Sequence, residues 1–565
     1  MLKVKVKLKL KIFFLAILFF AIFGASAKAS AATYYVKNGG NDSLSGLDDA
    51  NAWATPDRVM ATAGYSNIVA SGDTVYFRSQ DTWTGDNPLL IATSGVAYDG
   101  SAYGTGTRAK LKATAISNTS TVRIIESDVI FAGFEVDGSQ INSGGIYIGY
   151  SNSSPISNIT VDNCVVHDQG QPTGNTQKYW MYGILVGAKA NSSIVNTNIN
   201  ITNCEIYNTY HEGIAVYPSW GNTANCGNGV DGVIISHCKV YDNGTDNNDS
   251  NKSGNGIAIA VNNNSKNVTI EWCDLYDTGA VAPGQIYGIS VRDSLDGPIN
   301  GIPTDLVVRY NLIRNNTKDG IIFQNFYAQD QTSYFYNNLI YNNVGYGINF
   351  SSSDYGNSEF GIYNNTLYAE ANGIDTFVGC IGFSRDSSTI SGTPTFNLKN
   401  NILSVVTTSI SAYDYIPMYA DIGSGTLIHN NNLYYRSSGT DHVYVSTGNW
   451  GEHIVYDGEG DNIITAAWEP TAKITVPTFA GGTLPTGFSG TYGTNLLPNA
   501  DYFKITSGDA INNGATIGSP YYGNINTAGT ANPIARIAGA YDIGAYEYFG
   551  TDTTSPITPQ GLSVE

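Results

Sequence analysis

A histidine and a carboxylate stand side by side in the stretch "YHEGIAVY", where His211 and Glu212 precede a glycine that is followed by isoleucine. A histidine whose ring is oriented by a neighbouring acid can serve as a general base. The same two residues can also form an ordinary turn pair. The pair is therefore a candidate for proton transfer, and its value depends on where the fold places it.

Further charged and polar residues occupy comparable places in two later copies of this stretch, "YGISVRDS" and "KDGIIFQN". They are Arg292, Asp293, Lys318, Asp319 and Gln324. On a strand whose isoleucine faces inward, the residue three positions later faces outward, which places the arginine and the glutamine on a surface. The two pairs of a cation and a carboxylate can equally be solvated surface ion pairs, which contribute little.

Aromatic residues near these positions suit sugar binding. Tyr217 and Trp220 lie in the insertion "YPSWGNTANCGNGVD", and Tyr287 opens the copy that contains the arginine. An aromatic ring combines apolar area with a polar edge, and both match the surface of a sugar ring. Because the chain contains 39 tyrosines, a single tyrosine means little on its own.

Short repeated strands are the elements that would position these residues. Eight copies of the stretch pair a glycine with an isoleucine, at Ile146, Ile184, Ile214, Ile257, Ile289, Ile321, Ile348 and Ile374. Apolar and variable residues alternate within each copy, as in a strand with one buried face. A short strand with a tight turn cannot bury an apolar face alone, so the copies must stack into a solenoid with an aliphatic ladder.

A second frame marks each repeat with one cysteine or asparagine. The cysteines are Cys164, Cys204, Cys238 and Cys273, and the asparagines at the same place are Asn311, Asn338, Asn365, Asn401 and Asn432. Stacking at about 4.8 Å per rung lets the asparagines form an amide ladder that satisfies buried polar groups. The cysteines fit the same slot as free buried thiols or, since neighbouring rungs come within disulfide range, as a disulfide between rungs. Without CxxC spacing, a metal site at these cysteines is not expected.

The N-terminal residues and the overall charge limit the compartment and the partners. Residues 1–31 combine a lysine-rich start, an apolar run from Ile12 to Phe23 and small residues, which predicts a signal peptide and a secreted protein. Its removal takes away six lysines and no acids, so the net charge falls from −19 to −25. Such an acidic chain is not expected to bind nucleic acid or an anionic membrane. We expect a monomer with no membrane insertion after cleavage.

The repeated frames resemble those of right-handed parallel β-helix proteins, the pectate-lyase-like superfamily. "ITVDNCVVHD", "VIISHCKVYD" and "DGIIFQNF" are similar to its rungs, and "TYYVKNGGNDSLSGLDDANAWATPDRVM" is similar to its N-terminal cap. The resemblance spans residues 33 to about 549. It implies an all-β solenoid of about ten rungs, with the cap and first strands over 32–120, repeats over 121–445 and a closing segment over 446–549. Residues 550–565 resemble a linker and the start of a truncated fibronectin-III-like module.

For activity, the resemblance implies a secreted protein that acts on polysaccharide, and most directly a uronate lyase that works by β-elimination. In such lyases a cation, often Ca²⁺, neutralises the uronate carboxylate, and Arg or Lys removes the neighbouring proton. Carried over to this chain, Arg292 or Lys318 would be the base or charge partner, and Asp293 or Asp319 would bind Ca²⁺. A calcium bridge would also let an acidic protein hold an acidic polymer.

Two other functions remain open. The chain lacks the Tyr-Gly-x-Asp-Pro-His signature of alginate epimerases and a convincing lysine after an Asp-Gly-Phe strand, as in family 9 pectate lyases. This favours, as the first alternative, a β-helix that binds glycans or sits at a surface without catalysis. The second is a glycoside hydrolase, which would need two carboxylates about 5 to 10 Å apart. Glu212 and Asp319, three rungs apart, are farther than that.

Overall fold

The computed structural model describes most of the chain between residues 31 and 546. The described ranges are 31–60, 68–85, 88–114, 120–141, 144–150, 152–170, 181–188, 194–216, 229–244, 256–278, 286–292, 304–324, 330–352, 355–371, 378–385, 392–407, 415–422, 425–438, 441–446, 453–457, 468–490, 497–517 and 541–546. The expected signal peptide and the expected linker at 550–565 lie outside these ranges. Within them, no helix is long and apolar enough to cross a membrane.

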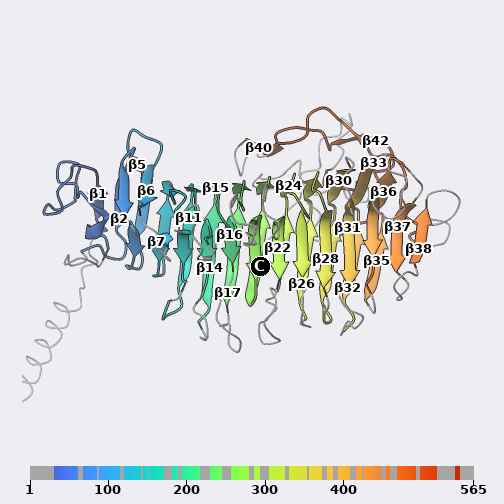
Figure 1. Cartoon of the computed structure of the whole chain (residues 1–565), viewed down its shortest axis with the longest axis horizontal. Helices are drawn as coiled ribbons and strands as arrows, with labels where there is room; N and C mark the ends of the chain where they lie inside the picture. The colour runs from blue at the N-terminus through green and yellow to red at the C-terminus, as the bar shows by residue number, and fades with distance from the viewer. Residues whose placement is uncertain are drawn as a thin grey trace, which may run out of the picture.

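Three long sheets, here called A, B and C, run the length of the molecule (Figure 1). Sheet A contains β1 (Thr33–Val36), β2 (Thr74–Ser79), β5 (Ala97–Gly104), β8 (Val129–Ala132), β11 (Ser157–Asp162), β14 (Asn196–Thr202), β17 (Val230–Ser236), β20 (Ser265–Glu271), β23 (Val307–Arg309), β26 (Thr332–Tyr336), β29 (Glu359–Tyr363), β32 (Thr395–Lys399) and β35 (Thr426–Asn430). Sheet B contains β3 (Thr82–Gly85), β6 (Ala109–Ala113), β9 (Phe134–Asp137), β12 (Val165–His167), β15 (Glu205–Tyr207), β18 (Lys239–Tyr241), β21 (Asp274–Tyr276), β24 (Leu312–Arg314), β27 (Leu339–Tyr341), β30 (Thr366–Ala371), β33 (Ile402–Thr407) and β36 (Leu433–Arg436). Sheet C contains β4 (Leu89–Ile91), β7 (Ser120–Ile124), β10 (Gly144–Ile148), β13 (Ile184–Val186), β16 (Ile214–Val216), β19 (Gly256–Asn262), β22 (Ile286–Arg292), β25 (Ile321–Gln324), β28 (Tyr346–Ser352), β31 (Val378–Arg385), β34 (Tyr415–Ala420), β37 (Asp441–Ser446) and β38 (His453–Asp457).

The chain visits the sheets in the order A, B, C once per rung, and successive rungs pair in parallel, which makes the fold a right-handed parallel β-helix. Sheets A and C each have 13 strands, more than the ten rungs expected, because the N-terminal segment from Thr33 onward already forms regular rungs. Only the last pair of sheet C, β37 with β38, is antiparallel. β38 is the last described strand of sheet C.

The aliphatic ladder predicted for sheet C is present, with a shift of register in one strand and a different residue in another. The stacked isoleucines are Ile146, Ile184, Ile214, Ile259, Ile289, Ile321, Ile348 and Ile381. The prediction that Ile257 belongs to the ladder is wrong, because Ile257 pairs with Tyr287 and lies in an outer apolar cluster. Regular alternation would put Ile257 and Ile259 on the same face, but it breaks here, because Ala258 and Ile259 both belong to the core cluster. Ile374 lies outside the described residues.

The predicted amide ladder is confirmed at the two-residue turn between sheets A and B. Each of Asn311, Asn338, Asn365 and Asn401 donates its side-chain and backbone N–H to the Oδ1 of the next asparagine, at 2.9 to 3.0 Å. Their amides also donate to backbone carbonyls of sheet A. Cys164, Cys204, Cys238 and Cys273 continue the slot as free buried thiols, and burial raises the pKa of the first three. Asparagine and cysteine can both occupy this position because each has a small side chain that fits inward at the tight turn.

A second polar ladder, which the sequence analysis did not identify, lies at the turn between sheets B and C. Thr278 donates to Asn316 at 2.8 Å, and Asn316 donates to Asn343 at 2.8 Å. Thr209 and Asn243 form the same contact at 2.7 Å in earlier rungs. The frames "YDNG", "YDTG", "RNNT" and "YNNV" carry its signal, since each places an Asn or Thr directly after a residue of positive φ.

The segment after β38 folds back along the outer face of sheet B and does not simply close the end of the solenoid. Its short strands β39 (Thr478–Phe479) with β42 (Ile505–Ser507), and β40 (Phe488–Ser489) with β41 (Leu497–Pro498), form two antiparallel pairs. Arg314 donates to the carbonyl of Thr486 at 3.0 Å, and Phe503 packs against Tyr341 and Tyr368. In Figure 1 the described part of this segment, in brown, crosses above the C-terminal half of sheet B.

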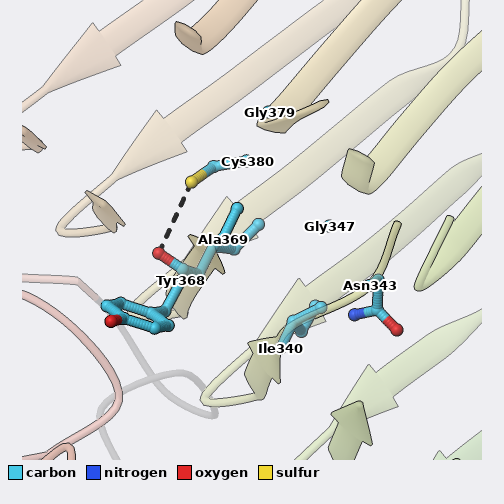
Figure 2. A pocket seen from close by; sticks show the side chains of 8 residues that line it. Ile340, Asn343, Gly347, Tyr368, Ala369, Gly379 and Cys380 are labelled. Carbon is cyan, nitrogen blue, oxygen red and sulfur yellow. Dashed lines mark hydrogen bonds between the residues drawn. The ribbon is translucent and has the colours of Figure 1, made fainter. Parts of the chain in front are cut away.

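A packing gap in the core lies where Cys380 takes the place of the repeated glycine. Cys380 follows Gly347 in the stack, and its thiol donates to the carbonyl of Leu367 at 3.5 Å (Figure 2). The gap is lined by Ile340, Asn343, Gly347, Leu367, Tyr368, Ala369, Gly379 and Cys380, and it is too narrow for a water molecule. It is a feature of packing and offers no room for a ligand.

Candidate functional site

Those predicted site residues that the structure describes lie on sheet C and on the turns that lead into it from sheet B. Arg292 ends β22, and its neighbours across the sheet are Asn262 on β19 and Gln324 on β25. The three side chains therefore form one polar row over successive rungs. Asn262 was missed by sequence reasoning because the register of β19 was placed two residues away.

Tyr287 stands at the start of the same strand and faces the turn that carries Lys318 and Asp319. The Nζ atom of Lys318 lies 6.0 Å from the centre of the Tyr287 ring, which is the outer limit of a cation–π contact. Burial and then the negative charge of Asp319 raise the pKa of Tyr287 to about 12, although Arg292 opposes this. The phenol therefore keeps its proton at neutral pH.

The alternative that Lys318 and Asp319 form a solvated surface ion pair does not describe Asp319. Its side chain is buried, and its two oxygens accept hydrogen bonds from the backbone N–H of Tyr346 at 2.6 Å and from the amide of Asn349 at 3.0 Å. Burial raises its pKa to about 6, because the two hydrogen bonds and the charge of Lys318 offset only part of the lost hydration. Lys318 itself is exposed.

His211 and Glu212 lie in the turn between β15 and β16, and both side chains are buried. His211 Nδ1 contacts a carboxylate oxygen of Glu212, and the edge of its ring faces Tyr182 at 5.7 Å. Burial and then the positive charge of Arg292 hold the pKa of His211 well below its usual range. The imidazole is therefore neutral at neutral pH, and its carboxylate partner fixes its orientation.

The structure thus brings several predicted residues into electrostatic reach of one another. The charge of Arg292 acts on both His211 and Tyr287, and that of Asp319 acts on Tyr287. Glu212 and Asp319 do not form a hydrolase pair, because three rungs at about 4.8 Å each separate their turns by about 14 Å. Tyr217, Trp220 and Asp293 lie outside the described residues.

Asp319 stays a predicted calcium ligand, and its oxygens have partners within the protein. Both oxygens of Asp319 already accept hydrogen bonds, whereas Ca²⁺ takes six to eight oxygen ligands. Among the described residues, no group of three histidine, cysteine or acidic side chains within metal-binding distance includes Asp319. A role for Asp293 and for Ca²⁺ stays a prediction.

Comparison with solved structures returned distant matches. Pectate lyase Pel9A is 13% identical, with a TM-score of 0.46, over 92% of this chain and 98% of that one. The A-module of mannuronan C-5 epimerase AlgE4 from Azotobacter vinelandii is 14% identical, with a TM-score of 0.46, over 73% of this chain and 100% of that one. A rhamnogalacturonan lyase is 15% identical, with a TM-score of 0.35, over 66% of this chain and 87% of that one. No protein-family model and no curated protein matched the sequence. The fold assignment rests on the strand pairing described above.

Proposed function

We propose that this protein is a polysaccharide lyase that holds a uronate polymer against the outer side of sheet C. The observation that carries the proposal is the convergence of an arginine, a lysine and a protonated tyrosine from two adjacent rungs. Arg292 ends β22, Tyr287 begins it, and Lys318 approaches the ring of Tyr287 from the next turn. Two cations on one face compensate for the acidic character of the chain and attract an anionic sugar.

Each residue has a distinct role in the proposed β-elimination. Arg292 pairs with the uronate carboxylate, which acidifies the adjacent C5 proton, because a guanidinium stays charged at any working pH. Lys318, whose Nζ approaches the ring of Tyr287 from the next turn, is the proposed acceptor of that proton. The electron pair forms a C4–C5 double bond, the C4–O4 bond breaks, and the leaving oxygen receives a proton from Tyr287. His211 and Glu212 are buried within electrostatic reach of Arg292, and in this proposal they act as positioning residues.

The test is a panel of pectate, alginate, glycosaminoglycan and neutral glycans, with absorbance of the unsaturated uronate as readout. We expect one acidic polymer to be cleaved, and K318A and Y287F each to lower kcat about 100-fold or more. Lys239, a half-exposed lysine on sheet B, supplies the matched control K239A, which should leave the rate unchanged. Parallel reactions with Ca²⁺ and with EDTA test the calcium prediction separately.

A glycan-binding protein without catalysis is the second candidate, and one observation favours it. The carboxylates of the described site are engaged within the protein, Asp319 by Tyr346 and Asn349 and Glu212 by His211. If a polymer binds and the binding depends on Arg292, while neither unsaturated products nor new reducing ends form, the binding function replaces the lyase.

Secretion is part of the proposal, supported by the lysine-rich and apolar start of the chain. Expression of the full chain followed by N-terminal sequencing of exported protein tests it. Cleavage after Ala27 or Ala31 is the expected result, and retention of residues 1–31 in exported protein would contradict it.

A further inference from the structure

A row of outward-facing residues continues from the proposed site along sheet C toward β37. Strand pairing places in one register Ser290, Ile322, Asn349, Gly382, Tyr419 and Tyr444. Their neighbours along the chain, such as Ile348 and Phe350 on either side of Asn349, belong to the core. The row therefore lies on the outer face and follows the solenoid axis from β22 to β37 (Figure 1).

Glycines make room for an aromatic ring in the middle of this row. A Cβ atom on Gly382 would stand 2.9 Å from ring atoms of Tyr346, and one on Gly379 would stand 2.8 Å from Cε1 of the same ring. Real Cβ atoms do not approach other atoms so closely. Glycine at both positions therefore lets the ring of Tyr346 lie across β31, between Asn349 and Tyr419 in the row.

Two further tyrosines continue the row beyond this ring. Tyr419 and Tyr444 stack with their ring centres 5.5 Å apart and their planes at 19°. Burial and then the negative charges of Asp319 and Tyr419 raise the pKa of Tyr346, so both groups lie within electrostatic reach of its hydroxyl. Tyr346 and Tyr419 are half-buried. The three tyrosines thus extend the proposed site from Asp319 to β37.

Asn349 joins the row to Asp319 and keeps one polar atom unpaired. Its amide donates to Asp319 at 3.0 Å, and the backbone N–H of Tyr346 donates to the other carboxylate oxygen. Among the described residues, the buried Oδ1 of Asn349 has no hydrogen-bond partner. Buried polar atoms are nearly always paired, so this one needs an explanation. A hydroxyl group of a bound sugar is a donor of the kind that it lacks.

We propose that this row binds the sugars next to the one that reacts, so that a uronate chain lies along the solenoid axis. The inference rests on the proposed function, which holds the reacting sugar at Arg292 and Lys318. The four steps from β25 to β37 cover about 19 Å, which is room for about four sugar residues of an extended chain. Each tyrosine ring offers apolar area to a sugar ring, and its hydroxyl offers a hydrogen bond.

Chain length separates this row from the reacting residues. In the wild type, kcat/KM should rise as sugars are added to a uronate oligosaccharide and level off after about four additions to the shortest substrate. In Y419A, KM for the polymer should rise about 10-fold, because a stacking contact is lost. The shortest substrate should react with Y419A at the wild-type rate, since it does not reach Tyr419, and this result also shows that the variant is folded.

A tyrosine on another sheet supplies the matched control. Tyr241 is half-buried on sheet B and stacks on Tyr207 and Tyr276, as Tyr419 stacks on Tyr444. Y241A should therefore leave KM unchanged for the polymer and for the shortest substrate. Equal kcat/KM for short and long substrates in the wild type would overturn the inference without any variant.

Binding without turnover distinguishes failure of this row from failure of the lyase. Calorimetry compares binding of the uronate polymer to K318A and to the double variant K318A/Y419A, and we expect about 10-fold weaker binding in the second. That result supports the row even if the wild type cleaves nothing. Binding that needs Arg292 but is equal in the two variants overturns this inference alone, whereas no uronate binding to the wild type overturns both proposals.

Discussion

At the scale of single residues, Asp319 shows how a repeat position changes meaning once its surroundings are known. In the sequence it is one half of a lysine–aspartate pair beside a glycine. In the structure it is a buried carboxyl group that accepts hydrogen bonds from the following rung at Tyr346 and Asn349. Sequence spacing could place it at the turn, but its burial depends on the next rung and on side chains beyond that turn.

The raised pKa of Asp319 predicts how stability depends on pH. Because its pKa rises from 3.8 in the unfolded chain to about 6 in the fold, the folded state binds more protons, and stability falls as pH rises from about 4 to 6. The shift corresponds to roughly 3 kcal/mol. In D319N this contribution disappears. Urea unfolding should therefore show that the unfolding free energy falls less between pH 4.5 and pH 6.5 in D319N than in the wild type. D501N, at an exposed carboxylate, should keep the wild-type slope, and an unchanged slope in D319N would refute the assignment.

At the scale of elements, the ladder of asparagines fixes the tight turn between sheets A and B. In N365A, the backbone and side-chain N–H groups of Asn338 both lose their acceptor, and the carbonyl of Phe335 loses a donor. All of these groups are buried, and each unsatisfied one costs about 1 to 3 kcal/mol. We expect N365A to lower the unfolding free energy by about 3 to 5 kcal/mol. N397A, which removes an exposed amide from a neighbouring strand, should change it by less than about 0.5 kcal/mol.

This ladder was predictable from sequence, whereas other features of the same rungs were not. Asparagine and cysteine share one small inward slot, and their regular recurrence revealed it. The second ladder, which includes Thr209, Asn243 and Thr278, mixes threonine and asparagine, so no single letter marks it. The register of β19 escaped because Ala258 takes the glycine slot there while Gly256 and Ile257 imitate the frame two residues earlier. A period-two pattern predicts the face of a residue only while the alternation holds, and pairing with the neighbouring strands fixes the register.

At the scale of the whole molecule, the C-terminal segment decides which surfaces remain available. Its contacts with sheet B join residues up to 179 positions apart, which no local pattern in the sequence encodes. Leu312, Leu339 and Tyr341 face outward on strands of sheet B, yet they are buried with Phe503 in one apolar cluster. The N-terminal half of the sheet keeps charged and half-buried aromatic residues on the same face. The half of sheet B that packs against Phe503 is therefore apolar, and the N-terminal half is polar.

The last prediction concerns how far a defect in this covering segment spreads. Phe503 is buried and packs against Tyr341 at 5.0 Å and Tyr368 at 5.6 Å, so F503A removes about 3 to 5 kcal/mol from that contact. Each rung of a solenoid contacts mainly its neighbours, so the loss should stay local. Hydrogen exchange should accelerate over residues 478–507 while β11 to β20 keep wild-type protection. V476A, at a residue 60% exposed in the same segment, should leave both regions unchanged. Faster exchange throughout sheets A and C would instead mean that the segment supports the entire solenoid.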